Sequence, residues 1–322
     1  MTETLTKLAP FTRLSDRVWR VLGGNPGRFT LQGTNTYLIG TGPRKLLLDC
    51  GEGVPDYVPL LEQSLQAISP QAYISDVIIS HGHKDHFGGL EGILSTPFFQ
   101  RKGIRVHKFP ISSSSSSCSI TNDNITVIDT ADLGHLQHFP PDIHVHPLHD
   151  QQVFQTEGAT LKVLHTPGHT QDHCTFWLEE EQSVFTADCI LGQGTAVFED
   201  LSAYLEGLRS ILRLHPVRLY PGHGPIVEPA LPKIKEYIAH REQREQQVLD
   251  FLNKPSTPME IVQVLYRDYP ASLHLPAAHS VLLHLLKLEK DRRVTWDKSN
   301  ESSPPHGSWK RADLLSKKWH RL

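Results

Sequence analysis

The sequence predicts a layered α/β protein followed by a smaller helical unit. Short apolar runs that end in polar loops recur along the first 230 residues, which is typical of strands buried in a sheet. Between two of these runs, apolar residues recur at helical spacing from Tyr57 to Ile68, so that one stripe of a helix faces the core. Strand, helix and strand in this order indicate a layered α/β architecture.

Composition limits the classes of function. The 322 residues are enough for a catalytic domain with an appendage, and the formal net charge of −3 gives no global attraction to nucleic acid. The four cysteines form no CxxC pair, which predicts reduced thiols in an intracellular protein. Neither an apolar run of the roughly 18 residues that a membrane span needs nor a signal peptide is found. We therefore expect the cytoplasm or the mitochondrial matrix, and no membrane partner.

The first elements lead up to a histidine-rich loop. Apolar segments predict strands, in chain order, at 18–21, 36–39, 46–48 and 77–79. Glycine-rich turns separate the first three strands, and the helix from Tyr57 to Ile68 precedes the fourth. Asp49 stands directly after the third strand, and the histidine-rich loop directly follows the fourth.

The segment from about 100 to 150 has a different composition. It contains an unbroken serine run at 112–117, followed by polar and proline-containing sequence. We interpret it as a surface insertion that is partly disordered. Because their spacing is irregular, we read as solvated loop residues, and not as metal ligands, the histidines at 135, 138, 144, 146 and 149.

Regular structure is expected again from residue 160. Apolar segments predict strands at 160–164, 174–178, 183–186 and 218–220, with an amphipathic helix at 201–212. His169, Asp188 and His223 stand in the polar segments that follow three of these strands. Metal-capable side chains after so many strands are difficult to explain by packing alone.

Past residue 230 the composition becomes helical. A long charged helix is followed by a capping box from Thr257 to Glu260, with Pro258 at the first helical position. A short strand is expected at 293–296. We therefore predict a catalytic domain over 1–230 and a winged-helix-like domain with a basic, aromatic tail over 231–322. We expect the tail to dock its tryptophans on the catalytic domain, in preference to stacking on bases.

The strongest local signal is the pattern HxHxDH. It places His81, His83, Asp85 and His86 within six residues, directly after a buried strand. His81 and His83 would meet one ion, and Asp85 and His86 would reach a second beside it. Chance clustering in a polar loop is a poor explanation, because three later segments supply matching donors.

These donors divide naturally between two ions. We assign His81, His83 and His169 to one ion, and Asp85, His86 and His223 to the other, with Asp188 as a bridge. Histidine and carboxylate ligands without cysteine indicate Zn2+, with Mn2+ or Fe compatible with the ligand type. Two such cations hold a shared hydroxide at neutral pH. Asp85 and Asp188 are the catalytic candidates, because either carboxylate would accept the proton during attack.

Two further residues are candidates for supporting roles. Asp49 would accept the free N–H of a ligand histidine, the alternative being a plain turn aspartate. His173 is expected behind the ligands or in contact with substrate, because six ligands and a bridge already fill two ions.

Taken together, HxHxDH, the histidine of TPGHT, an aspartate after a strand and the PGHG segment resemble the metallo-β-lactamase superfamily. The resemblance implies an αββα sandwich with two zinc ions at the edges of its sheets. NPG at 25–27, TLQGTNTYL at 30–38 and TAVFED at 195–200 are similar to the β-lactamase-like protein 2 group of endoribonucleases. The fungal metallo-β-lactamase-type thioesterases of polyketide biosynthesis are similar over the same stretch. Gly82, Cys50 and the serine-rich insertion depart from the pattern, but none removes a ligand.

Three functions follow as hypotheses. The first is a dinuclear zinc hydrolase that uses a metal-bound hydroxide to cleave single-stranded RNA, although the near-neutral charge is unusual for phosphate binding. The second is an acyl-thioester hydrolase acting on acyl carrier proteins. The third is a non-catalytic binding module, which is disfavoured because structural zinc sites are usually closed and mononuclear.

Overall fold

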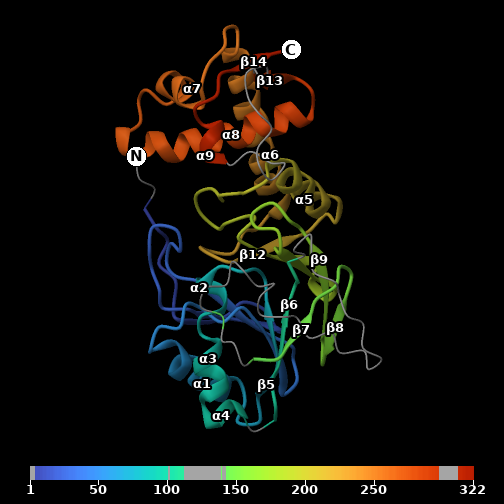
Figure 1. Ribbon diagram of the computed structural model, residues 1–322. Helices are drawn as coiled ribbons and strands as arrows, with labels where there is room; N and C mark the ends of the chain where they lie inside the picture. The colour runs from blue at the N-terminus through green and yellow to red at the C-terminus, as the bar shows by residue number, and fades with distance from the viewer. Residues whose placement is uncertain (1–3, 101, 112–138, 140–142, 297–310) are drawn as a thin grey trace.

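The computed structural model describes residues 4–100, 102–111, 139, 143–296 and 311–322. Two sheets face each other and helices cover their outer sides (Figure 1), which confirms the predicted αββα sandwich. The first sheet has the order β1 (Phe11–Arg13), β2 (Val18–Leu22), β3 (Asn35–Ile39), β4 (Arg44–Leu48), β5 (Tyr73–Ile79), β6 (Arg105–Lys108) and β7 (Val145–Pro147). The second has the order β12 (Arg218–Pro221), β11 (Ser183–Ala187), β10 (Cys174–Leu178), β9 (Ala159–His165) and β8 (Val153–Thr156).

Successive residues of a central strand pack into two different layers. In β3, Tyr37 and Ile39 face the second sheet, where the Tyr37 ring lies 5.0 Å from that of Phe185. Leu38 points the other way and packs with Leu61 beneath the helices. Both faces of the strand are therefore buried, which explains why Tyr37, Leu38 and Ile39 form an apolar run that does not alternate with polar residues.

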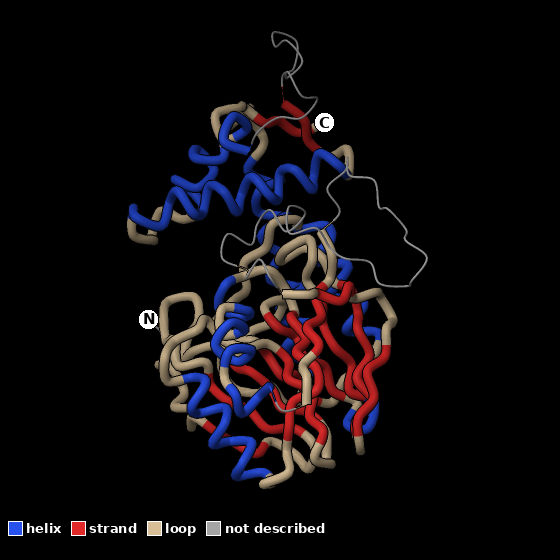
Figure 2. The backbone as a smooth tube through the Cα atoms, turned by 60° about the horizontal axis from the view of Figure 1, so that its bottom comes forward, coloured by secondary structure: helices blue, strands red, loops and turns tan. Residues whose placement is uncertain are grey.

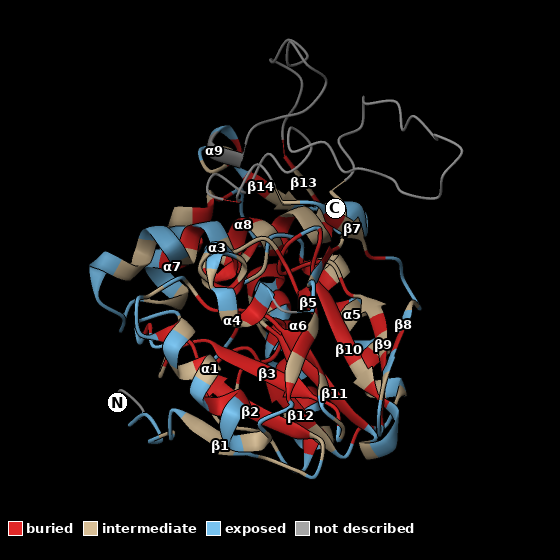
Figure 3. Cartoon of the chain, turned by 90° about the horizontal axis from the view of Figure 1, so that it is seen from below, coloured by how far each residue is buried: buried red, intermediate tan, exposed pale blue. Residues whose placement is uncertain are grey.

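Each sheet has its own set of covering helices. The first sheet is covered by α1 (Tyr57–Ile68), α2 (Lys84–Phe87), α3 (Leu90–Ser95) and α4 (Pro97–Gln100). The second is covered by α5 (Leu201–Arg213) and the first half of α6 (Ala230–Phe251), and a short turn η2 (Glu179–Glu181) joins β10 to β11. Figure 2 shows the strands enclosed between helices, and Figure 3 shows the same strands as buried, with the exposed sides of the helices at the periphery.

Part of the segment expected to be an insertion belongs to the first sheet. β6 pairs with β5, and β7 pairs with β6, both in parallel. The sequence of β6 is polar although most of the strand is buried. Its polar side chains are accommodated because they have buried partners: His107 contacts Asp76, and Lys108 contacts Asp172. The expected insertion is therefore too wide at both ends. The serine run at 112–117, His135 and His138 lie outside the described residues.

The C-terminal unit is a winged-helix domain, as predicted. It contains the second half of α6, α7 (Pro258–Leu265), the turn η3 (Ala271–Leu273), α8 (His274–Lys290), β13 (Val294–Trp296), α9 (Arg311–Leu314) and β14 (Trp319–Arg321). The expected capping box is present, because Thr257 Oγ1 accepts from the Glu260 backbone N–H and Glu260 Oε2 accepts from that of Thr257. None of the described helices is both long and apolar enough to cross a membrane.

The basic tail ends differently from the expectation. Trp319 is fully buried inside the C-terminal unit, and β14 pairs with β13 so that Trp319 stands opposite Trp296. The tail therefore completes the small sheet of its own unit and does not dock Trp319 on the catalytic part; Trp309 lies outside the described residues. Helix α6 is shared by both parts, since Ile234 packs beneath the second sheet and Val248 packs in the C-terminal core. The boundary at 230/231 stays a prediction.

Candidate metal centre

Seven histidine and aspartate side chains meet where strands of both sheets end. They come from the loop after β5 (His81, His83), from α2 (Asp85, His86), from the loop between β9 and β10 (His169), and from the residues after β11 (Asp188) and β12 (His223). These are the seven residues predicted as ligands, and their ligation stays a prediction. Among the described residues, His144, His146 and His149 belong to neither metal-capable group.

Glycines allow the loops to approach this closely. A Cβ at Gly222 would lie 2.5 Å from Asp188 Oδ1, and one at Gly89 would lie 2.0 Å from the Cys50 carbonyl. Either clash would displace a loop that carries metal-capable side chains.

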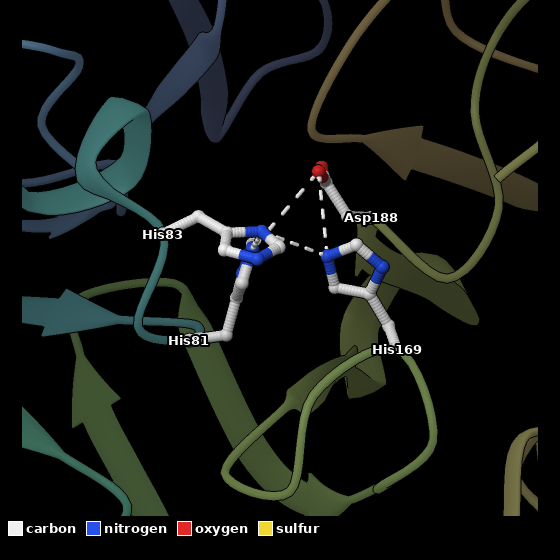
Figure 4. A group of neighbouring side chains, drawn as sticks. All are labelled: His81, His83, His169 and Asp188. Atoms are coloured by element: carbon white, nitrogen blue, oxygen red, sulfur yellow. Dashed lines mark hydrogen bonds and ion pairs between the residues drawn. The ribbon is translucent and has the colours of Figure 1, made fainter. Parts of the chain in front are cut away.

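The first group contains three imidazoles and one carboxylate oxygen (Figure 4). His83 Nδ1 lies 3.0 Å from Nε2 of both His81 and His169. Asp188 Oδ2 lies 3.7 Å from His169 Nε2 and 4.0 Å from His81 Nε2. All four side chains point toward one common centre.

The second group lies on the other side of Asp188. Asp85 Oδ2 lies 3.3 Å from His86 Nε2 and 3.1 Å from His223 Nε2. Asp188 Oδ1 lies 3.3 Å from each of the same two nitrogens. The two oxygens of Asp188 therefore face different groups, which is the arrangement that a bridging carboxylate requires.

Acceptors behind the imidazoles determine which ring nitrogen carries the proton. The Nδ1–H of His86 donates to Asp49 Oδ2, and that of His169 donates to the Val197 carbonyl, each over 2.8 Å. Ser80 Oγ donates its only proton to Asp49, so it accepts from His81 Nδ1–H at 3.0 Å. The inward Nε2 atoms of these histidines therefore present lone pairs to the centre when the rings are neutral.

Burial and neighbouring charges determine which histidines and aspartates of the two groups are charged. Burial lowers the pKa of both His81 and His169, which keeps these imidazoles neutral. Burial also opposes the imidazolium of His223, but the carboxylates of Asp188 and Asp85 outweigh it and raise its pKa to about 9. The pKa of Asp188 falls well below its usual range, because His223 and His86 outweigh the effect of its burial.

This donor set fits divalent cations. His86 Nε2 and Asp188 Oδ1 are buried and have no hydrogen-bond partner within the described part of the chain. In the first group, three lone-pair nitrogens face one another with at most the His83 proton between them. Lone-pair atoms that face one another in this way raise the free energy of the folded protein unless a cation or protons lie between them. Imidazole and carboxylate without thiolate suit zinc, manganese or iron.

The two predicted supporting residues lie behind the site. Asp49 accepts from the backbone N–H and the Oγ of Ser80, each at 2.8 Å, as well as from His86. His173 is fully buried, its Nδ1 lies 3.1 Å from Thr166 Oγ1, and its ring centre lies 5.3 Å from that of His81. Burial, with the neighbouring His169, lowers the pKa of His173 to about 3. His173 is not among the residues that line the pocket over the site.

A pocket of about 400 Å³ opens above the two groups. The residues that line it include Arg28, Phe29, Leu191 and Val197. Phe29 is 72% exposed and Val197 is 58% exposed, so two large apolar side chains of the lining are open to solvent. We call these four residues the pocket rim. The sequence analysis assigned no role to them, although an aromatic residue beside an arginine in a glycine-rich turn is a recognisable signal.

Comparisons with known proteins place the same residues in a family. Residues 29–223 match the metallo-beta-lactamase superfamily, and residues 257–309 match the beta-lactamase associated winged helix domain. A Drosophila melanogaster protein named Beta-lactamase-like protein 2 homolog is 43% identical over 293 residues, which cover 89% of this chain and 93% of the relative. An Aspergillus novofumigatus protein named atrochrysone carboxyl ACP thioesterase is 36% identical over 253 residues, 78% and 68% of the two chains. The solved beta-lactamase domain protein from Burkholderia ambifaria has the same fold, with a TM-score of 0.75 at 17% identity over 98% of this chain and 95% of that one.

Proposed function

The chain belongs to the metallo-beta-lactamase superfamily, and from this premise we propose that it is a dinuclear metal-dependent hydrolase that cleaves single-stranded RNA. The observation that carries the dinuclear proposal is the position of Asp188, whose two carboxylate oxygens face two separate groups of imidazoles. His81, His83 and His169 would hold one divalent cation, and Asp85, His86 and His223 the other. The donor set favours zinc.

When bound, such a pair polarises the electrophile and lowers the pKa of a water toward ~7. The chain supplies the rest of the chemistry. Asp188 and Asp85 both have pKa values below their usual range, so each is ionised at neutral pH; burial acts against this, and the neighbouring imidazoles outweigh it. Either carboxylate is therefore in the ionised form that a proton acceptor for the attacking water needs, although its depressed pKa makes it a weak base.

The pocket rim supports an RNA substrate. An exposed aromatic ring such as Phe29 offers a face on which an unpaired base stacks. Arg28 lies beside it and lines the same pocket, where its guanidinium would contact a phosphate. A single strand meets this geometry better than a duplex, because its bases are free to turn toward the protein.

A second candidate is hydrolysis of an acyl thioester. Leu31, Leu191 and Val197 give the pocket apolar walls, and Arg28 is the one lysine or arginine among the described lining residues. Apolar walls suit an acyl chain, whereas several cations would suit a polyphosphate. The printed name of the Aspergillus novofumigatus relative also refers to a thioesterase.

The test offers both substrates to the same preparation. Zinc-loaded protein is incubated in parallel with single-stranded RNA and with an acyl-thioester, beside an Asp85→Ala/His86→Ala double variant. We expect RNA cleavage by the wild type and none by the variant. Cleavage that survives in the variant would be contamination and would remove the RNA proposal, and thioester turnover alone would establish the second candidate in its place.

A further inference from the structure

The segment between β11 and α5 has two tasks at the site. This segment, residues 189–200 and here called the pocket loop, forms one wall of the pocket through Leu191, Gly194 and Val197. Its Val197 carbonyl also accepts the Nδ1–H of His169 over 2.8 Å. The loop contains no helix or strand of its own, so its backbone groups need partners elsewhere in the protein.

Helix α6 provides those partners. Tyr237 and Arg241 are four residues apart and therefore lie on one face of the helix. The Tyr237 hydroxyl accepts from the Leu191 N–H at 3.2 Å and donates to the Gly194 carbonyl at 2.9 Å. Arg241 Nη2 donates to the Ala196 carbonyl at 2.6 Å. Two side chains of α6 thus hold three backbone groups of the pocket loop.

The guanidinium of Arg241 is buried for this contact. Arg241 is only 7% exposed, and its guanidinium carbon lies 4.9 Å from the centre of the Phe198 ring. Phe198 in turn stacks on Tyr204 at 5.3 Å and meets His284 of α8 edge-on at 6.2 Å. Removing a cation from water is unfavourable, so packing alone would be served better by an uncharged side chain. What the charge adds is the hydrogen bond to the loop and the interaction with the Phe198 ring.

We propose that Arg241, together with Tyr237, is a positioning residue for the metal centre. Arg241 holds the Ala196 carbonyl by a hydrogen bond, and this fixes the position of the next carbonyl, that of Val197. The Val197 carbonyl accepts from His169 Nδ1–H, so that His169 Nε2 stays directed at the first group. Tyr237 fixes the start of the same loop. The inference rests on the proposed role of His169 as a ligand, and it gives the helix shared with the winged-helix domain a part in building the active site.

The test measures metal affinity and not turnover. Metal-free wild type, Arg241→Met and Tyr237→Phe are titrated with Zn2+ against a chromophoric chelator. Loss of a direct partner of a ligand histidine typically costs 10–100-fold in affinity. Arg241 acts through one more residue, so we expect the affinity for one of the two zinc ions to fall about 10-fold in Arg241→Met. The affinity should also fall in Tyr237→Phe. Glu242→Ala is the matched control, because Glu242 is an exposed residue of α6 that pairs with Arg209 and does not contact the loop.

Wild-type affinity in both variants would overturn the proposal, whatever their thermal stability, because packing would then be the only role of the two side chains. If Arg241→Met does not fold, Tyr237→Phe decides, since it removes a single hydroxyl. The failure of the proposed function is separable. A wild type that binds zinc but cleaves neither substrate removes the proposed activity alone, whereas a wild type that binds no zinc overturns both.

Discussion

Asp49 Oδ2 lies 2.8 Å from His86 Nδ1, on the side of the imidazole that faces away from Asp188. The same oxygen accepts from Ser80 Oγ, which in turn accepts from His81 Nδ1–H. A single carboxylate therefore orients one histidine of each group, His86 directly and His81 through the serine hydroxyl. Asp49 directly follows β4 and has a positive φ of 57°, and its carboxylate reaches Ser80 and His86.

Asp49→Asn should weaken metal binding in both groups. The carboxylate accepts three hydrogen bonds, and an amide would set its NH2 against one of these donors. We expect a loss of about 10–100-fold in affinity for each cation, measured as zinc retained against a graded chelator. Ser80→Ala interrupts only the path to His81, so it should affect one cation. Equal effects of Ser80→Ala on both cations would contradict the relay, and the exposed Asp16→Asn is the control.

Asp188→Ala should lower the occupancy of both cations, whereas His223→Ala should lower that of one. The reason is that the two oxygens of Asp188 face different groups, whereas His223 directs its Nε2 at Asp85 and Asp188 within the second group. Metal analysis of dialysed protein gives the number of zinc ions retained by each variant. Retention of one ion at full occupancy in Asp188→Ala would show that the carboxylate is not shared.

Much of this site could be predicted from the sequence, because metal donors carry their own chemistry. His81, His83, Asp85 and His86 lie within six residues, and the other donors follow apolar runs that form strands in the structure. Strand prediction was accurate where both faces are apolar, as at β10. It missed β6, where the buried Lys108 forms an ion pair with Asp172, 64 positions away.

The support for the site was beyond the reach of pattern reading. The Val197 carbonyl that orients His169 is a backbone group and leaves no signal in residue type. Arg241 reads as one more charge on a charged helix, and only the fold shows that it is buried against Ala196, 45 residues earlier. Long-range contacts of this kind depend on how the layers pack, which local periodicity does not encode.

Lys108→Met should destabilise the protein strongly, although neither Lys108 nor its partner is a proposed ligand. Lys108 and Asp172 form an ion pair in which both side chains are essentially unexposed, and Asp172 also accepts from Thr170. Leaving one buried charge unpaired typically costs 3–5 kcal/mol, so we expect about 3 kcal/mol less free energy of unfolding in urea. The double variant Lys108→Met/Asp172→Leu should recover most of this loss, because no charge is then left unpaired. A double variant as unstable as the single one would contradict this reason.

Stability should also depend on Asp76 at acid pH. Burial acts to raise the pKa of Asp76, but hydrogen bonds from His107, Ser75 and Arg105 outweigh it and hold the pKa below its usual value of 3.8. A carboxyl with a depressed pKa stabilises the fold above the unfolded value and loses that contribution as the pH falls below it. We therefore expect Asp76→Asn to be less stable than the wild type at pH 7, and the difference to shrink below about pH 4. Urea midpoints measured from pH 7 to pH 3 test this, and a difference that stays constant would contradict it.

Phe29 offers a way to distinguish the two substrates by side-chain shape. Phe29 is 72% exposed on the pocket wall, and a flat ring stacks on a base whereas a branched aliphatic chain does not. Stacking is worth about 1–3 kcal/mol per base, so Phe29→Leu should raise KM for single-stranded RNA about 10-fold, while Phe29→Trp should keep it near the wild type. For an acyl chain only apolar contact matters, so Leu would be tolerated as well as Trp. Tyr269→Leu is the control, because Tyr269 is an exposed aromatic residue that does not line the pocket. Equal KM values for RNA in Phe29→Leu and Phe29→Trp would remove stacking, and with it the main support for RNA as the substrate.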